Sequence, residues 1–175
     1  PVLASGEDVN VFVFDTEVYS NTGGQASKAS NMGQVAQFAA AGKAIGKKSL
    51  AEIAMSYGYV YVAQVAMGAD MNQLMKALTE AEAYHGPSLI IGYAPCEMHG
   101  IKGGMQNCQL EMKRAVDAGY WLMFRYNPTL ESGKLIVDSK EPTTDYTKFI
   151  ESENRYARLE ASNPARAAVL FEKAK

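Results

Sequence analysis

The sequence is poor in cysteine and histidine and has no long apolar run. Its 175 residues include only two Cys and two His, and Cys96 and Cys108 are too few for a disulfide framework. The apolar runs are strand-sized, and no basic segment followed by an apolar one opens the chain, so nothing indicates a signal peptide or a membrane span. We therefore expect a cytoplasmic protein with reduced thiols and no membrane partner.

The sequence also has no excess of charge of either sign. Its 17 Lys and Arg residues against 19 Asp and Glu residues leave a formal net charge of −2. Binding to nucleic acid or to an anionic membrane needs a basic surface, so we predict no nucleic-acid partner. The chain starts at Pro1 in mid-pattern. We interpret it as a segment of a longer protein, with a processed mature start as the alternative.

Apolar runs alternate with helical patterns along the chain, which predicts an α/β fold with a mostly parallel sheet and crossover helices. Strands are predicted at 9–14, 59–68 and 88–95, with further strand-like runs at 120–128 and 133–139, and helices at 35–48, 50–58, 71–86, 108–119 and 163–175. Ser49 and Asp70 are the predicted N-caps of the second and third of these helices. The first strand is almost wholly apolar, which favours burial on both faces.

A glycine-rich polar loop, DTEVYSNTGGQASK at 15–28, directly follows the first strand. Its oxygen-bearing side chains are those of Asp15, Thr16, Glu17, Ser20, Asn21 and Thr22. Ligands of open α/β sheets bind at the carboxyl ends of strands, hard cations such as Mg²⁺ prefer oxygen ligands, and glycine amides can face a diphosphate. The loop has neither a Walker A ending nor dinucleotide-binding spacing, and many polar loops only turn the chain. From the residues alone it is a candidate metal–phosphate loop.

The stretch DTEVYSNTGGQASKAS at 15–30 resembles the thiamine-diphosphate loop of the pyruvate:ferredoxin (or flavodoxin) oxidoreductases. The resemblance continues through 38–101, so that it covers roughly residues 3 to 130 well and the tail more loosely. It implies a thiamine-diphosphate-binding fold that is incomplete at its N-terminal side. On this reading 1–130 is the C-terminal portion of the cofactor-binding domain, and 131–175 is a polar extension that packs on a neighbouring domain or subunit.

The resemblance also implies roles for single residues of the loop. The Thr16 side chain, the Val18 carbonyl and the Asn21 side chain would bind the Mg²⁺ that holds the cofactor's diphosphate. Asn21 would also lie near the reactive thiazolium and is the predicted catalytic residue. Gly23 and Gly24 would let the loop close over the diphosphate.

Cys96 stands in the stretch APCEMHG, just past the third strand. A lone cysteine is more often a small buried apolar residue than a ligand, and an iron–sulfur cluster usually needs four thiolates. The resemblance nevertheless implies that Cys96 provides one ligand of a 4Fe–4S cluster whose other ligands lie outside this chain. Cys108 matches no cluster position and is interpreted as structural. His85 and His99 show no carboxylate partner in the sequence, so we assign them no catalytic role.

The function implied by the resemblance is the oxidative decarboxylation of pyruvate in anaerobic metabolism. Coenzyme A is the co-substrate, acetyl-CoA and CO₂ are the products, and electrons pass through 4Fe–4S clusters to ferredoxin or flavodoxin. The partners are the remaining domains of a homodimeric enzyme. The family's Gly-Asp-Gly motif is absent from this chain, so we expect the chain alone to be inactive. The alternatives are a 2-oxoacid oxidoreductase with another substrate, a stand-alone non-catalytic binding or scaffold domain, and a simple nucleotide-binding protein.

Overall fold

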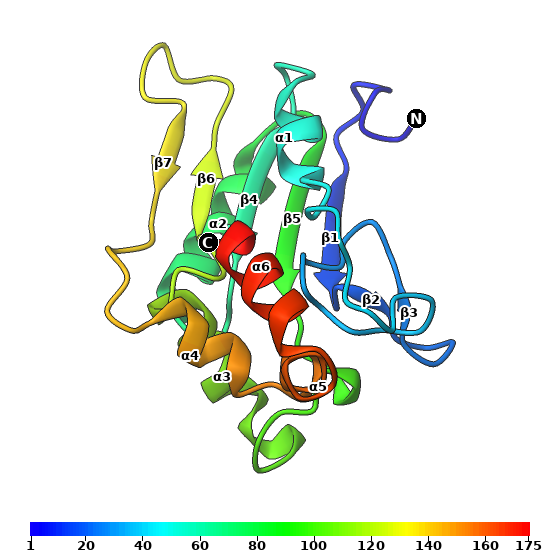
Figure 1. Ribbon diagram of the computed structural model, residues 1–175. Coiled ribbons are helices and arrows are strands. Elements are labelled where there is room, and N and C mark those ends of the chain that lie inside the picture. The colour runs from blue at the N-terminus through cyan, green and yellow to red at the C-terminus, as the bar shows by residue number, and fades with distance from the viewer.

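The computed structural model describes all residues, 1–175, and its centre is a five-stranded sheet in the order β1-β5-β4-β6-β7 (Figure 1). The first three strands in this order are parallel, and β6 and β7 add to them antiparallel. This confirms the predicted α/β fold with a mostly parallel sheet. The strands are β1 (Asn10–Asp15), β4 (Tyr61–Val65), β5 (Ser88–Tyr93), β6 (Phe124–Tyr126) and β7 (Leu135–Val137), and a separate small hairpin pairs β2 (Val18–Tyr19) with β3 (Gln25–Ala26).

Six α-helices and two short 3₁₀ helices complete the chain. They are α1 (Leu50–Met55), α2 (Met71–Ala83), η1 (Glu97–His99), η2 (Met105–Asn107), α3 (Cys108–Asp117), α4 (Tyr146–Glu151), α5 (Asn154–Ser162) and α6 (Pro164–Ala174). Both predicted N-caps are confirmed: Ser49 Oγ accepts the amide of Glu52 at 3.1 Å, and Asp70 Oδ1 accepts the amide of Gln73 at 3.0 Å. None of these helices has both the length and the apolar character that a bilayer crossing requires.

The helices cover the two faces of the sheet unequally. Helix α2 packs behind β4 and β5, while α1, α5 and α6 lie over the opposite face (Figure 1). The larger core, on the α1–α5–α6 side, includes Phe149, Tyr156, Leu159 and Phe171 from the C-terminal region. These residues of the predicted extension therefore pack on the sheet of their own chain. A contact of 131–175 with a neighbouring domain or subunit stays a prediction.

The predicted helix at 35–48 is wrong, because this segment is an irregular loop. The Gly33 amide donates to the Lys43 carbonyl at 2.8 Å, and the Lys43 amide donates to the Gln34 carbonyl at 3.0 Å. The chain passes so near to α5 at Gly42, with φ of +76°, that a Cβ there would lie 2.6 Å from Leu159 Cδ2. These tertiary contacts outweigh the helix propensity of the alanines, which is weak beside packing.

The prediction that the first strand is buried on both faces is also wrong. Phe12 and Phe14 of β1 have exposed fractions of 38% and 72%. They lie on the same face as Ile90 of β5, which α2 covers, but α2 reaches only β4 and β5. One face of β1 is therefore left uncovered by this chain.

Candidate functional site

The glycine-rich loop lies at the carboxyl edge of the parallel strands, where the sequence places it. Strands β1, β5 and β4 end at Asp15, Tyr93 and Val65, and the hairpin β2–β3 continues directly beyond the end of β1 (Figure 1). Carboxyl ends of parallel strands are where open α/β sheets bind ligands. The location alone therefore makes the loop the leading candidate site.

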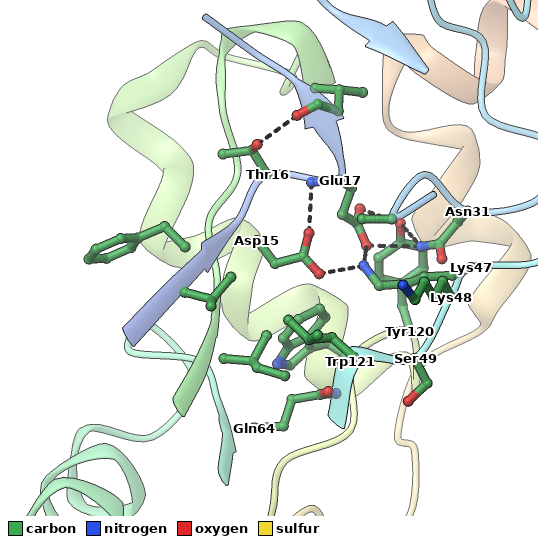
Figure 2. Close-up of a pocket in the computed structure, with 16 residues that line it drawn as sticks. Asp15, Thr16, Glu17, Asn31, Lys47, Lys48, Ser49, Gln64, Tyr120 and Trp121 are labelled. Carbon is green, nitrogen blue, oxygen red and sulfur yellow. Dashed lines mark hydrogen bonds and ion pairs between the residues drawn. The ribbon is translucent and has the colours of Figure 1, made fainter. Parts of the chain in front are cut away.

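A cavity of about 400 Å³ opens beside the loop (Figure 2). Its volume falls within the range typical of small-molecule pockets. Apolar side chains such as Val13, Ile91 and Trp121 line one part of it, and Asp15 and Lys47 line another. The remaining lining residues are Phe14, Thr16, Glu17, Val18, Ala29, Asn31, Lys48, Ser49, Leu50, Gln64 and Tyr120. Two of the predicted metal ligands, Thr16 and Val18, thus border a cavity.

Thr16 and Val18 present their oxygens to each other. The Thr16 hydroxyl donates to the Val18 carbonyl, with 3.0 Å between the two oxygens. Two adjacent ligands of an octahedral Mg²⁺, each about 2.1 Å from the ion, are about 3 Å apart. The spacing of 3.0 Å is that of an ordinary hydrogen bond and is also compatible with two neighbouring Mg²⁺ ligands, and both oxygens are of the chemical type that this cation prefers.

The rest of the predicted loop ligands lie on the turn between β2 and β3. The Asn21 side chain is exposed there and forms no hydrogen bond within the chain. Gly23 and Gly24 have φ values of +111° and +85°, which side chains other than glycine rarely adopt. The turn closes through a hydrogen bond of 2.9 Å from the Gly24 amide to the Tyr19 carbonyl. Cofactor contacts of Asn21, Gly23 and Gly24 stay predictions.

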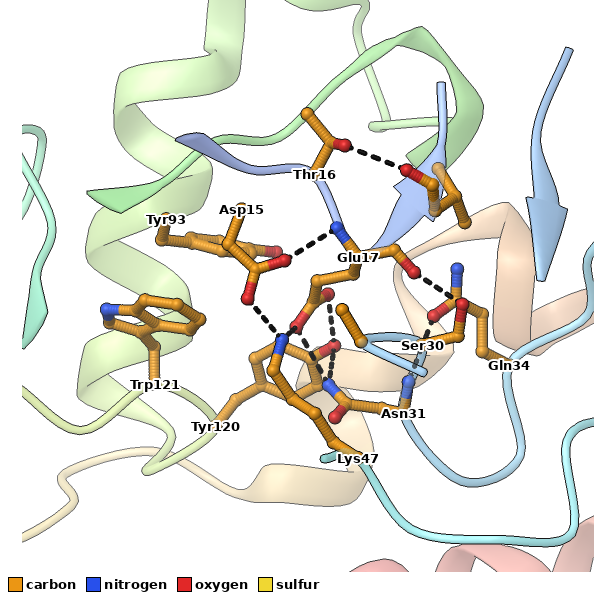
Figure 3. Close-up of polar contacts among 12 residues, drawn as sticks. Asp15, Thr16, Glu17, Ser30, Asn31, Gln34, Lys47, Tyr93, Tyr120 and Trp121 are labelled. Atoms are coloured by element: carbon orange, nitrogen blue, oxygen red, sulfur yellow. Dashed lines mark hydrogen bonds and ion pairs between the residues drawn. The ribbon is translucent and has the colours of Figure 1, made fainter. Parts of the chain in front are cut away.

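Glu17, which lies between Thr16 and Val18 in the sequence, turns its side chain away from these two oxygens and is fully buried (Figure 3). Its carboxylate accepts hydrogen bonds from Lys47 at 3.0 Å and from Arg155 at 2.6 Å. Burial by itself raises the pKa of Glu17, but the charges of Lys47 and Arg155 outweigh burial and lower this pKa to about 2. Glu17 is therefore an anion at neutral pH.

Lys47 ties this buried carboxylate to the end of the first strand. Its Nζ lies 2.6 Å from Asp15 Oδ2 and 5.3 Å from the centre of the Trp121 ring (Figure 2). The Lys47 ammonium group thus pairs with the carboxylates of Asp15 and Glu17 and also lies over an aromatic ring. This arrangement depends on the extended path of 35–48, because the loop must carry Lys47 back over the end of β1.

Sequence reasoning noted Glu17 only as one oxygen donor among several and missed Lys47, Tyr120 and Arg155. A charged residue directly between two proposed metal ligands was a usable signal for Glu17. No local pattern relates it to Arg155, which lies 138 positions further along the chain.

Cys96 lies on a segment that contacts the loop through Met98. It has a free, half-buried thiol and follows the end of β5 by three residues. Met98, two residues on, packs against Gly24 so closely that a Cβ on Gly24 would lie 2.4 Å from Met98 Cε. The segment that carries the predicted cluster ligand therefore contacts the glycine turn of the predicted diphosphate loop. Service of Cys96 as a cluster ligand stays a prediction.

Each histidine lies near a carboxylate that the sequence did not indicate, although the buried His99 Nε2 forms no hydrogen bond. His99 is buried, and its Nε2 lies 3.8 Å from Glu17 Oε2, while the exposed His85 lies 3.4 Å from Asp8. The Cys96 amide donates to His99 Nδ1 at 3.1 Å, so the other nitrogen, Nε2, carries the proton of the neutral ring. Burial and the charge of Arg155 lower the pKa of His99 to about 3.

Comparison with known proteins identifies the family. Residues 2–91, just over half of the chain, match the family described as thiamine pyrophosphate enzyme, C-terminal TPP binding domain. The chain belongs to this family of thiamine pyrophosphate enzymes. The matched residues include β1, the loop, β4 and all but the end of β5. The carboxyl-edge site is therefore the edge of a thiamine-pyrophosphate-binding domain.

Among curated proteins, this thiamine pyrophosphate domain is similar to parts of much longer enzymes. It is 60% identical over 176 residues to the pyruvate:ferredoxin oxidoreductase of Moorella thermoacetica, with 99% of this chain covered. It is 56% identical over 175 residues to the pyruvate-flavodoxin oxidoreductase of Klebsiella pneumoniae, with 98% covered. The chain spans about 15% of the length of each of these relatives.

A solved structure shares the fold. The chain superposes on a 2-oxoglutarate:ferredoxin oxidoreductase from Magnetococcus marinus with a TM-score of 0.50 and 20% sequence identity. The match covers 55% of this chain and 33% of that one. At this identity the likeness shows the fold alone, and it agrees with the mostly parallel sheet.

Proposed function

We propose that this chain is the part of a pyruvate:ferredoxin or pyruvate:flavodoxin oxidoreductase that holds the diphosphate of thiamine diphosphate through Mg²⁺. The observation that carries the proposal is the spacing of 3.0 Å between the Thr16 hydroxyl and the Val18 carbonyl at the carboxyl edge of the sheet. The 56–60% identity to enzymes of those names supports the choice of reaction.

Each residue of the loop has a defined task in this proposal. Thr16 and Val18 provide two neighbouring ligands of Mg²⁺, and the Asn21 side chain, which has no partner within the chain, provides a third close to the thiazolium. Gly23 and Gly24 keep side chains away from the diphosphate. The bound cofactor supplies the electron sink that decarboxylation of a 2-oxoacid requires, and the protein contributes binding and orientation.

Cys96 is proposed as one ligand of a 4Fe–4S cluster close to the cofactor. The packing of Met98 on Gly24 supports this, because it holds the Cys96 segment against the loop. No group of three or more His, Cys, Asp and Glu side chains in this chain is arranged to hold a metal, so other cluster ligands come from further parts of the enzyme. Electrons leave through such clusters to ferredoxin or flavodoxin, and coenzyme A accepts the acetyl group.

The remaining domains of the enzyme are the proposed partners of two exposed apolar surfaces. On β1, the Phe12 and Phe14 rings lie 4.8 Å apart on the uncovered face of the sheet. In the loop at 36–45, Phe38 has an exposed fraction of 92% and a φ of +65°, a strained angle for an aromatic residue. Such surfaces are typical of contacts with other domains or with a second copy in a homodimer. We place the enzyme in the reducing cytoplasm.

The test of the proposal uses the full-length enzyme with Thr16→Val and Asn21→Ala. Each change removes one oxygen ligand, so the Mg²⁺ concentration needed to retain thiamine diphosphate through gel filtration should rise about tenfold or more. Thr79→Val is the matched control, because Thr79 is exposed on α2 and its hydroxyl only bonds the Met75 carbonyl. Unchanged cofactor retention in both loop variants would contradict the proposal.

A second measurement tests the assignment to a larger enzyme. An immunoblot of cell lysate with an antibody against this segment should show a polypeptide several times larger than the 19.0 kDa of the chain itself. A single band near that mass would instead support a separate small binding protein. Turnover assays of the purified enzyme with pyruvate and with other 2-oxoacids then identify the substrate.

A further inference from the structure

Glu17 has an unusual backbone conformation at the centre of the proposed metal loop. Its φ is +59°, in the left-handed region that is unfavourable for a residue other than glycine. Strain of this kind persists only where surrounding contacts impose it, and it gathers at functional sites. The turn at Glu17 sends its side chain into the interior while Thr16 and Val18 keep their oxygens 3.0 Å apart.

Contacts from several distant segments hold Glu17 in this conformation (Figure 3). Its backbone amide donates to Asp15 Oδ1 at 2.9 Å, and its carbonyl accepts the Ser30 hydroxyl at 2.5 Å. The donors to its carboxylate are Lys47 at 3.0 Å and Asn31 at 2.9 Å on Oε1, and Arg155 at 2.6 Å and Tyr120 at 2.7 Å on Oε2. Both backbone polar groups and both carboxylate oxygens are therefore engaged.

Arg155 is the contact that ties the loop to the C-terminal helices. Its guanidinium is 1% exposed and donates through Nη1 to Glu17, through Nε to Glu153 at 2.6 Å and through Nη2 to Tyr120 at 2.9 Å. The Arg155 carbonyl also accepts the Val35 amide at 2.7 Å. Helix α5 thus holds the Glu17 carboxylate in place through the Arg155 side chain. Removal of Arg155 would leave the buried Glu17 carboxylate with less positive charge nearby to balance its own.

We propose that Glu17 and Arg155 are positioning residues that hold the Thr16 hydroxyl and the Val18 carbonyl at the spacing of neighbouring Mg²⁺ ligands. Through them, helix α5 sets the affinity of the loop for the cation. The inference rests on the proposed Mg²⁺-diphosphate function of this loop and adds that the preorganisation comes from the C-terminal region. Groups that orient metal ligands from behind typically change metal affinity 10- to 100-fold when they are removed.

The experiment compares Arg155→Met with Arg125→Met in the full-length enzyme. Arg125 is another arginine with little exposed surface, but it pairs with Glu80 at 2.5 Å and with Asp138 at 2.8 Å, away from the loop. The measured quantities are the Mg²⁺ concentration for half-maximal retention of thiamine diphosphate and the thermal midpoint. We expect about a tenfold rise in that Mg²⁺ concentration for Arg155→Met. Arg125→Met should lower the midpoint yet leave Mg²⁺ dependence within about twofold of wild type.

A conservative variant separates positioning from general stability. Arg155→Lys keeps the positive charge but loses the fork that reaches several acceptors, so its Mg²⁺ dependence should lie between those of wild type and Arg155→Met. If Arg155→Met does not fold, Tyr120→Phe removes the hydroxyl that donates to Glu17 and accepts from Arg155, and we expect a rise of about threefold in the Mg²⁺ requirement.

The inference is overturned if Arg155→Met, or Tyr120→Phe in its place, leaves the Mg²⁺ requirement at the wild-type value. It is also overturned if Arg125→Met raises that requirement as much as Arg155→Met does. Thr16→Val distinguishes this failure from failure of the proposed function. Normal Mg²⁺ dependence of Thr16→Val would contradict the proposed metal site itself. A raised Mg²⁺ requirement in Thr16→Val but not in Arg155→Met would contradict only the role of α5.

Discussion

Substitution of Gly24 by alanine is the perturbation that the structure allows us to work out most fully. Gly24 has a φ of +85°, and an added Cβ would lie 2.4 Å from Met98 Cε and 3.3 Å from Met98 Cγ. Two separate costs therefore arise. One is the strain of a left-handed backbone with a side chain, and the other is the collision with Met98.

The two costs can be estimated separately. The backbone strain is roughly 1–2 kcal/mol, from which the reduced freedom of the unfolded chain returns about 0.4–1 kcal/mol. Overpacking adds about 1–3 kcal/mol. The lower end applies here, because the colliding atom is the end of a flexible side chain that is 38% exposed. Gly24→Ala should therefore lower the free energy of unfolding by about 2 kcal/mol.

The assay is urea unfolding of the 175-residue chain, with Gly58→Ala as the matched control. Gly58 has a similar φ of +78°, but a Cβ there would meet nothing within 4 Å. Gly58→Ala should thus show the strain alone, about 1 kcal/mol. Combination of Gly24→Ala with Met98→Ala should recover about 1 kcal/mol as a coupling free energy.

Equal destabilisation by Gly24→Ala and Gly58→Ala would refute this reasoning. A loss at Gly24 that persists unchanged in the Met98→Ala background would refute it as well. Either result would mean that the glycine turn does not rest on Met98. The proposed proximity of the loop and the Cys96 segment would then lose its main support.

Two further predictions concern the cysteine and the buried charges. Cys96→Ser in the full-length enzyme should lose one cluster's iron while thiamine diphosphate content stays near wild type, whereas Cys108→Ser should lose none; an unaltered iron content in Cys96→Ser would return this thiol to a structural role. The pKa of Glu17 is lowered from 4.5 to about 2 and that of His99 from 6.5 to about 3, so both groups bind protons on unfolding and their contribution to stability is lost as pH falls. Burial raises the pKa of Glu153 to about 7, against the opposing charge of Arg155, so its contribution is present below pH 4.5 and is lost as pH rises toward 7. Urea unfolding of the chain should therefore give a nearly constant stability between about pH 5 and 6.5 and a steep fall below about pH 4.5, and Glu153→Gln should make stability increase with pH between about 4.5 and 6.5. A constant stability down to pH 3 would contradict these charge assignments.

Local patterns in the sequence determined the secondary structure wherever neighbouring residues carry the relevant interactions. Ser49 and Asp70 cap helices because each side chain accepts an amide only two or three residues away. The apolar runs at 9–14 and 88–95 form parallel strands, as the alternation with helices indicates, and the fold makes them neighbours. The position of the loop at 15–28 beyond the first strand also followed from sequence order alone.

Tertiary structure decided the features that depend on long-range contacts. The alanines at 39–41 favour a helix locally, yet the segment is a loop because Gly42 packs on Leu159 and Lys47 must reach Asp15. The exposure of Phe14 on β1 depends on where α2 lies, which periodicity does not report.

The buried network around Glu17 is the clearest case. From its residues alone the loop was a candidate metal–phosphate loop, and its resemblance to the thiamine-diphosphate loop of the oxidoreductases proposed Thr16 and Val18 as ligands of one cation. The sequence held no trace of Arg155, because an ion pair across 138 residues leaves no periodic signal in either segment. The sequence by itself determined that a polar, glycine-rich loop follows the first strand, at the edge of the sheet where ligands bind. Only the folded chain determined that Glu17 is paired with a buried arginine on α5, because the pairing forms only when distant segments meet in an interior that excludes water.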